Sequence, residues 1–138
     1  MEKLFNLTSI AIGVAGGAAA QILGGVDALI YALVILMGLD YITGVIKGIY
    51  FKRLSSEMGF RGILKKMLII IMVALANTVQ GLLGVDAAIR ETVIMFYAAN
   101  EAISILENVA EVMPNMPKGL KETLLRIRSA SEDEEMKK

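Results

Sequence analysis

The sequence predicts an all-α integral membrane protein with four transmembrane helices, arranged as two hairpins, and with both chain termini in the cytoplasm. Its 138 residues are 56% hydrophobic, and the mean hydropathy is +0.63. The apolar residues gather in four almost uncharged blocks, each close to the ~20 residues that cross a bilayer core as a helix. The charges balance to zero overall but are segregated along the chain.

The predicted spans cover residues 7–26, 28–46, 67–85 and 92–110. The first is uncharged and rich in small residues, and the fourth is the least hydrophobic. Together they form a transmembrane region over residues 1–113. Pro114 and Pro117 stop the last helix, so residues 114–138 form a charged cytoplasmic tail that contains an amphipathic segment at 118–128.

Basic residues set the predicted orientation, because cytoplasmic loops of membrane proteins carry an excess of Lys and Arg. The link between the second and third spans is predicted to be a basic cytoplasmic loop that holds Lys47, Lys52, Arg53, Arg61, Lys65 and Lys66. In this topology only Arg90, of 14 basic residues, lies outside. Within the loop, Ser55 and Ser56 can cap a helical segment that lies at the inner interface and runs into the third span. The predicted location is therefore a membrane that the chain crosses several times.

An internal repeat supports the two hairpins. Residues 21–28 align with residues 80–87 at six of eight positions, and the shared residues include a Gln and an Asp. One interpretation is a duplicated hairpin forming parallel repeats. The other is convergence on one kind of outer turn, in which Asp27 and Asp86 each begin a descending helix.

Asp40 is the one charged residue of the second span. It precedes Lys47 by seven residues, which places it roughly 10 Å inside the inner interface at ~1.5 Å per residue. An acid well inside the bilayer costs about 2.5–3.5 kcal/mol on insertion scales, so it faces protein or water. Asp40 is either a pore-lining or gating acid, or an acid satisfied by Tyr41, Thr43 or a lysine of a neighbouring helix.

A polar stripe follows one face of the fourth span. Its members recur at helical spacing, and they are Tyr97, Glu101, Ser104, Asn108 and Glu111, flanked by Asn100 and Glu107. Such a helix lines water in an oligomer, packs its polar face inward within a bundle, or lies flat on the membrane. The pore or gating candidates are accordingly Asp40, Asn100, Glu101, Ser104, Glu107 and Asn108.

Two pairs of glycines are spaced four residues apart. Gly13 and Gly17 lie in the first span, and Gly44 and Gly48 lie at the end of the second. Small residues at this spacing let membrane helices approach closely, including helices of other subunits. They are the predicted helix-packing positions and favour a homo-oligomer.

Enzymatic machinery is not expected. The sequence has no Cys and no His, which removes thiol chemistry and the commonest metal ligand and general base. No phosphate-binding glycine loop or nucleic-acid-binding face is apparent. We therefore expect no catalytic residue, metal, cofactor or nucleic-acid partner, and a channel, pore or accessory role.

Three stretches of sequence resemble the holin family involved in toxin secretion and phage lysis in clostridia, bacilli and their phages. They are Leu-Asp-Tyr-Ile-Thr-Gly-Val at 39–45, Leu-Ser-Ser-Glu-Met-Gly-Phe-Arg-Gly-Ile-Leu-Lys-Lys at 54–66 and Phe-Tyr-Ala-Ala-Asn-Glu-Ala-Ile-Ser-Ile-Leu-Glu-Asn at 96–108. The resemblance implies a protein that accumulates in the host cytoplasmic membrane and opens lesions. These lesions would release an endolysin, or in some relatives a large toxin.

Within these stretches the resemblance marks the residues Asp40, Tyr41, Thr43, Gly44, Asn100, Glu101, Ser104, Glu107 and Asn108, without assigning them a mechanism. The expected partners are membrane lipids and other copies of the chain, to which the resemblance adds an endolysin and leaves open whether there is an antiholin. The alternative functions are a small ion or solute channel and a non-conducting membrane accessory protein.

Overall fold

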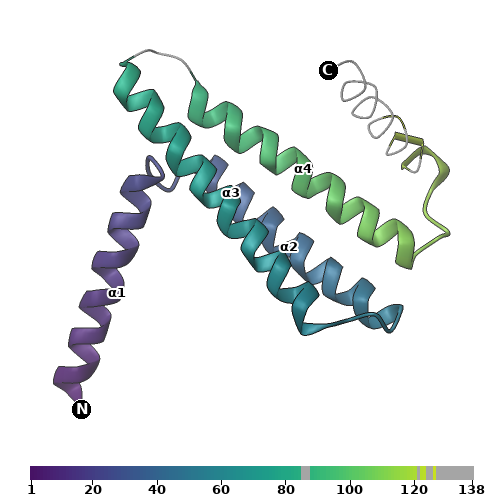
Figure 1. Ribbon diagram of the computed structural model, residues 1–138, viewed down its shortest axis with the longest axis horizontal. Coiled ribbons are helices and arrows are strands. Elements are labelled where there is room, and N and C mark those ends of the chain that lie inside the picture. Colours follow the sequence, from purple (N-terminus) through teal and green to yellow (C-terminus); the bar gives the residue numbers. More distant parts are fainter. Residues whose placement is uncertain (85–87, 121, 124–125, 127–138) are drawn as a thin grey trace.

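The computed structural model describes residues 1–84, 88–120, 122, 123 and 126. Four long helices follow one another along the chain: α1 (Glu2–Ile22), α2 (Ala28–Tyr50), α3 (Ser56–Leu83) and α4 (Ile89–Val112) (Figure 1). The described residues contain no strand, which confirms the predicted all-α class.

Three of these helices, α1, α2 and α3, are long and apolar enough to cross a membrane. The fourth, α4, has the length of a span but interrupts its apolar surface with several charged side chains. Each predicted span lies largely within one helix. Helix α1 begins before its predicted span, α2 ends beyond its own, α3 begins before its own, and α4 is longer than predicted at both ends.

Helices α2, α3 and α4 pack together, whereas α1 diverges from them (Figure 1). The most extensive packing is between α2 and α4, and α3 lies against both. Among the described helices α1 contacts only α3, and none of its residues is buried. The chain therefore consists of a three-helix unit and one separate helical arm.

The apolar core lies between α2, α3 and α4. It contains Ile30, Leu33, Met37, Ile69, Val73 and Ile94. Positions 30, 33 and 37 fall on one face of α2, and positions 69 and 73 on one face of α3, because residues three or four apart are stacked along a helix. Most of the remaining apolar side chains point outward, for example Leu39 and Ile42 of α2, as expected for surfaces in contact with lipid.

Side-chain caps define where α2 and α3 begin. Asp27 accepts a hydrogen bond from the Ile30 amide at 3.0 Å, and Ser55 accepts one from the Met58 amide at 3.1 Å. Each satisfies an amide that has no partner within its own helix. Because α3 begins at Ser56, the segment predicted to lie at the inner interface is continuous with the third span.

The two helix junctions at the end of the unit away from the α2–α3 link involve glycine. After α1, Gly24 and Gly25 have φ angles of +80° and +97°, and α3 ends at Gly84 with φ of +59°. A side chain would be strained in this left-handed region. Asp86 lies outside the described residues, so its predicted role at the second outer turn stays a prediction, as does the amphipathic tail segment at 118–128.

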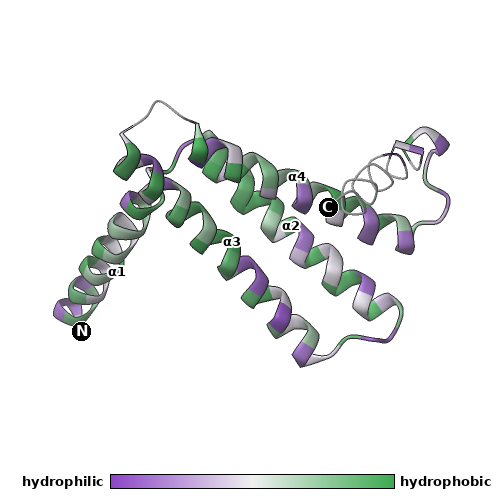
Figure 2. Cartoon of the chain, turned by 45° about the horizontal axis from the view of Figure 1, so that its top comes forward, coloured by the Kyte–Doolittle hydropathy of each residue, from purple (hydrophilic) through white to green (hydrophobic). Residues whose placement is uncertain are grey.

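Hydropathy varies along the length of the unit rather than only around it. Figure 2 shows purple, hydrophilic bands on α3 in the part that follows the α2–α3 link, and green, apolar surface on the part farther away. The charged residues of this part of α3 include Lys65 and Lys66. This uneven distribution brings α3 charges beside the second half of α2.

Candidate functional site

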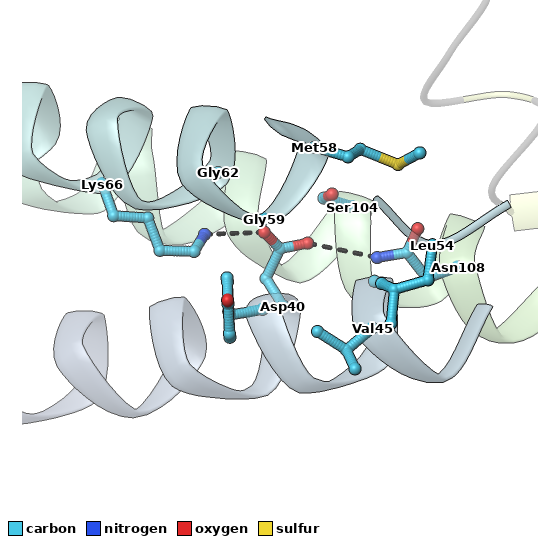
Figure 3. Close-up of a pocket in the computed structure, with 11 residues that line it drawn as sticks. Asp40, Val45, Leu54, Met58, Gly59, Gly62, Lys66, Ser104 and Asn108 are labelled. Carbon is cyan, nitrogen blue, oxygen red and sulfur yellow. Dashed lines mark hydrogen bonds and ion pairs between the residues drawn. The ribbon is translucent and has the colours of Figure 1, made fainter. Parts of the chain in front are cut away.

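An ion-pair cluster joins the three packed helices about halfway along α2. The Lys66 ammonium of α3 donates a hydrogen bond to Asp40 of α2, with Nζ 2.6 Å from Oδ2. The same ammonium donates to the carboxylate of Glu101 on α4. One cation therefore bridges two acids from two other helices, and Figure 3 shows it reaching toward Asp40 from the facing helix.

This cluster is largely shielded from its surroundings. Glu101 is 4% exposed, and the side chains of Lys66 and Asp40 are 14% and 17% exposed. Removing charged groups from water costs several kcal/mol per ion unless each finds a partner of opposite charge. The three charges are stable here because they satisfy one another.

Polar groups of α2 and α4 extend the cluster. The Asn108 amide donates to Asp40 Oδ1 at 3.3 Å and to Thr43 Oγ1 at 3.2 Å, and the first of these bonds is drawn in Figure 3. The Thr43 hydroxyl in turn donates to the Asp40 carbonyl at 3.0 Å. In the described chain no buried side-chain nitrogen or oxygen lacks a hydrogen-bond partner.

A cavity of about 160 Å³ opens beside the cluster. The residues that line it come from α2, α3, α4 and the α2–α3 link, and they are Asp40, Tyr41, Gly44, Val45, Leu54, Met58, Gly59, Gly62, Lys66, Ser104 and Asn108 (Figure 3). A methyl group on Gly59 would lie 3.4 Å from the Tyr41 hydroxyl, and one on Gly62 would lie 3.6 Å from its ring. Glycines of α3 thus leave room for the Tyr41 ring.

A second ion pair lies about two turns farther along α2 and about three turns farther along α4. The Lys47 ammonium lies 2.8 Å from Glu111 Oε1, with the two side chains 32% and 53% exposed. Exposed pairs of this kind contribute about 0–1 kcal/mol. It adds little stability but fixes the same α2–α4 register.

The predicted polar stripe of α4 faces α2 and α3. Glu101 belongs to the ion-pair cluster, Ser104 and Asn108 line the cavity, and Glu111 pairs with Lys47. The flanking candidates Asn100 and Glu107 are exposed and belong to neither. The structure therefore brings together four of the six pore or gating candidates, namely Asp40, Glu101, Ser104 and Asn108.

The two glycine pairs have different surroundings. A methyl group on Gly48 would lie 3.0 Å from Leu54 Cδ1, and one on Gly44 would lie 3.7 Å from Asn108 Nδ2. At Gly13 and Gly17 no neighbouring atom of the described residues lies within 4 Å of the equivalent position. The second pair packs within the chain, whereas the first pair is uncovered.

The six residues of the predicted basic loop are divided between the link and the helices that it joins. Lys52 and Arg53 lie in the link, and Lys47 lies in the last turn of α2. Arg61 and Lys65 are exposed on α3, where Arg61 pairs with Glu57 at 2.7 Å. Lys66, in contrast, is the centre of the ion-pair cluster.

Sequence reasoning missed the roles of Lys66 and Arg90. Lys66 was assigned to a loop with other basic residues, although a neighbouring lysine was one of the alternatives for satisfying Asp40. Arg90 is 3% exposed and pairs with Asp27, with its guanidinium nitrogen 2.8 Å from Oδ2. Its isolation on the predicted outer side is the sequence feature that could have indicated a structural role. Basic residues are normally concentrated on the cytoplasmic side, so a single arginine on the other side calls for a partner.

The Arg90 pair changes the acidity of Asp27, which lies in the turn before α2. The hydrogen bond from Arg90, with a second from the Ile30 amide, lowers the pKa of Asp27 to about 2. The carboxylate is therefore ionised at any physiological pH, and the pair persists.

Within the described residues no group of three or more His, Cys, Asp or Glu side chains could hold a metal ion. The cluster of Lys66, Asp40 and Glu101 instead has the composition of a helix-joining ion pair. Apolar helices of membrane-spanning length around such a cluster define the class of this chain, a small helical membrane protein.

The chain belongs to the bacteriophage holin family, whose model matches residues 17–129. This confirms the family resemblance of the sequence motifs. A probable holin of Bacillus phage phi105 is 34% identical over 70% of this chain and 72% of its own length. An uncharacterized protein of Listeria innocua is 42% identical over 99% of this chain and 96% of its own. An uncharacterized protein of Clostridium perfringens is 38% identical over 94% and 98%, respectively. No solved structure matches the chain.

Proposed function

We propose that this protein is a holin that oligomerises in the bacterial cytoplasmic membrane and forms lesions through which an endolysin reaches the cell wall. Membership of the bacteriophage holin family and similarity to a probable phage holin support this function. The structural observation that carries the mechanism is the Lys66 bridge between Asp40 and Glu101. It joins three helices through charges that become available to water if the helices separate.

The single chain represents the closed form in this mechanism. Its polar α4 residues face α2 and α3, and its exposed surface on α2 and α3 is mainly apolar. A subunit of this kind can diffuse in the bilayer without opening a water path, because its charges pair internally. Copies therefore accumulate without harm to the cell.

Opening requires the ion-pair cluster to exchange partners. At high density, helices of neighbouring copies compete for the contacts of α4, and its polar face turns from α2 and α3 toward water shared by many copies. Moving one charge across the membrane potential is worth ~2.3 kcal/mol per 100 mV. Charges within the bilayer thus make opening sensitive to that potential.

The mechanism includes four spans with both termini in the cytoplasm. The inner side then holds the α2–α3 link with Lys52 and Arg53, while the turn containing Asp27 lies outside. The absence of native Cys permits a direct test with single-cysteine variants at Asn6, Val26, Lys52 and Asn115. In intact cells a membrane-impermeant thiol reagent should label only the Val26→Cys variant; labelling at Asn115→Cys would contradict four spans.

The function is tested by inducible expression in a bacterium, with and without a cytoplasmic endolysin that lacks an export signal. Culture density and membrane potential are followed together. A holin gives delayed, abrupt depolarisation, with lysis only when the endolysin is present. Depolarisation without lysis would identify a small channel, and no effect from protein confirmed in the membrane would identify an accessory protein.

A further inference from the structure

Arg90 joins all four helices at one junction, at the end of the unit away from the α2–α3 link. Its guanidinium donates to the carbonyl oxygens of Leu23 at 2.5 Å and Gly25 at 3.1 Å. These carbonyls follow α1, where the last groups of a helix have no partner within it. The same guanidinium pairs with Asp27, the cap of α2.

Helix α3 completes this junction with two amide side chains. Asn77 donates to the Ile22 carbonyl at 3.0 Å, and the Gln80 side-chain oxygen accepts from the Arg90 amide at 2.9 Å. The residue before α4, Ala88, supplies no side-chain cap. Gln80 therefore caps α4 from a neighbouring helix, and Arg90 caps α1 from another.

Away from the junction α1 has little support from the part of the chain that the structure describes. It has no buried residue, it contacts only α3 among the described helices, and it diverges from the three-helix unit toward its N-terminus (Figure 1). The backbone between α1 and α2 includes Gly24 and Gly25, both at positive φ. These two residues can change conformation without the steric cost that a side chain would impose.

We propose that Arg90 is the anchor of a hinge about which α1 swings as a separate arm while α2, α3 and α4 remain one unit. The anchor holds the outer end of α1 through backbone carbonyls, so it fixes position without depending on the α1 side chains. The inner end is free to take different angles in the bilayer. This inference goes beyond lesion formation and is tested without lysis.

Gly24 is part of the anchor because it lets both Asn77 and Arg90 approach. A methyl group on Gly24 would lie 2.4 Å from Asn77 Oδ1 and 2.7 Å from Arg90 Nε, closer than such atoms pack, and the φ of +80° would strain a side chain there. The Gly24→Ala change therefore displaces the two side chains that hold the end of α1 without altering their charge. Gly81→Ala is the matched control, since that position has open space and an ordinary backbone.

The experiment uses pairs of spin labels on the full chain, reconstituted in lipid and diluted with unlabelled protein so that distances are within one subunit. Cysteines at Phe5 and Phe60 report the inner end of α1 against α3. Cysteines at Gln21 and Leu82 report its outer end. Cysteines at Phe60 and Glu107 report the three-helix unit, and all of these side chains are exposed.

The hinge predicts a broad distance distribution for the inner α1 pair, and narrow distributions for the outer α1 pair and for the pair within the three-helix unit. Arg90→Gln and Gly24→Ala should each broaden the distribution of the outer pair and leave that of the pair within the unit narrow. Gly81→Ala should change neither distribution. A distance distribution of the inner α1 pair as narrow as that of the pair within the unit would contradict the movement of α1. A distribution of the outer pair that is unchanged in both variants would contradict the role of Arg90 as anchor. Broadening of the pair within the unit as well would show that Arg90 supports the whole fold instead.

Discussion

Lys66 and Asp40 lie 26 residues apart in sequence, yet their side chains meet across α3 and α2 with Nζ 2.6 Å from Oδ2. The lysine also binds Glu101 of α4. These contacts join α2, α3 and α4 into one unit, and they place the charges of the proposed mechanism where the helices meet.

Removing Lys66 alone should weaken the three-helix unit. The Lys66→Gln variant leaves Asp40 and Glu101 buried without a cation, and breaking a buried ion pair in this way costs about 3–5 kcal/mol. Resistance to unfolding by denaturing detergent should fall accordingly. Stability equal to that of the unaltered protein would contradict a structural role for the pair.

The loss should be reversed when the acids are neutralised too. The triple variant Lys66→Gln, Asp40→Asn, Glu101→Gln keeps hydrogen-bonding groups and removes every charge of the cluster. Because no buried charge is then left without a partner, this variant should be more stable than Lys66→Gln. The comparison separates unpaired charge from lost packing; Lys65→Gln, which alters an exposed neighbour, is the matched control.

Neutralising only the acids should change the time of lysis. The double variant Asp40→Asn, Glu101→Gln weakens the contacts of α4 with α3, and it removes the acidic charges that respond to membrane potential. Onset of lysis should shift when protein levels are matched. Timing identical to that of the unaltered protein would remove these acids from the gating mechanism, and the exposed Glu107→Gln variant should leave timing unchanged.

The two glycine pairs should respond differently to added methyl groups. At Gly48 the methyl group meets Leu54 at 3.0 Å, whereas at Gly13 it meets no atom within 4 Å. Overpacking of this kind costs typically about 1–3 kcal/mol, so Gly48→Ala should lower the stability of the monomer in detergent and Gly13→Ala should not. If Gly13→Ala instead changes only cross-linking between copies, α1 contacts other subunits.

Acid should weaken the Arg90 junction through Asp27. Arg90 lowers the pKa of this carboxyl to about 2, below its ordinary value of ~3.9, so the folded state favours the ionised form. The resulting stability is fully present above about pH 4 and is lost as the pH falls toward about 2. Thermal unfolding in detergent between these values should depend less on pH in Asp27→Asn, and equal slopes would show that the Arg90 pair contributes nothing.

The amino-acid sequence was sufficient to predict four helices, a membrane location and the holin family. Apolar blocks of bilayer length are local features, and a helix satisfies its own backbone hydrogen bonds in lipid whatever its neighbours are. The caps at Asp27 and Ser55 are local too, because they bind amides three residues away. Periodicity likewise grouped Glu101, Ser104 and Asn108 on one face of α4.

Only the tertiary structure decided what that face meets. Whether a polar stripe faces water, lipid or protein depends on how each helix is rotated and which helices it crosses, and neither hydropathy nor periodicity contains that information. The packing of α4 on α2 and α3 selected Lys66 as the partner of Asp40 and Glu101, where the sequence offered several basic residues. It also separated α1 from the unit and gave Arg90 its carbonyl partners, because interactions between distant segments form only when the helices pack.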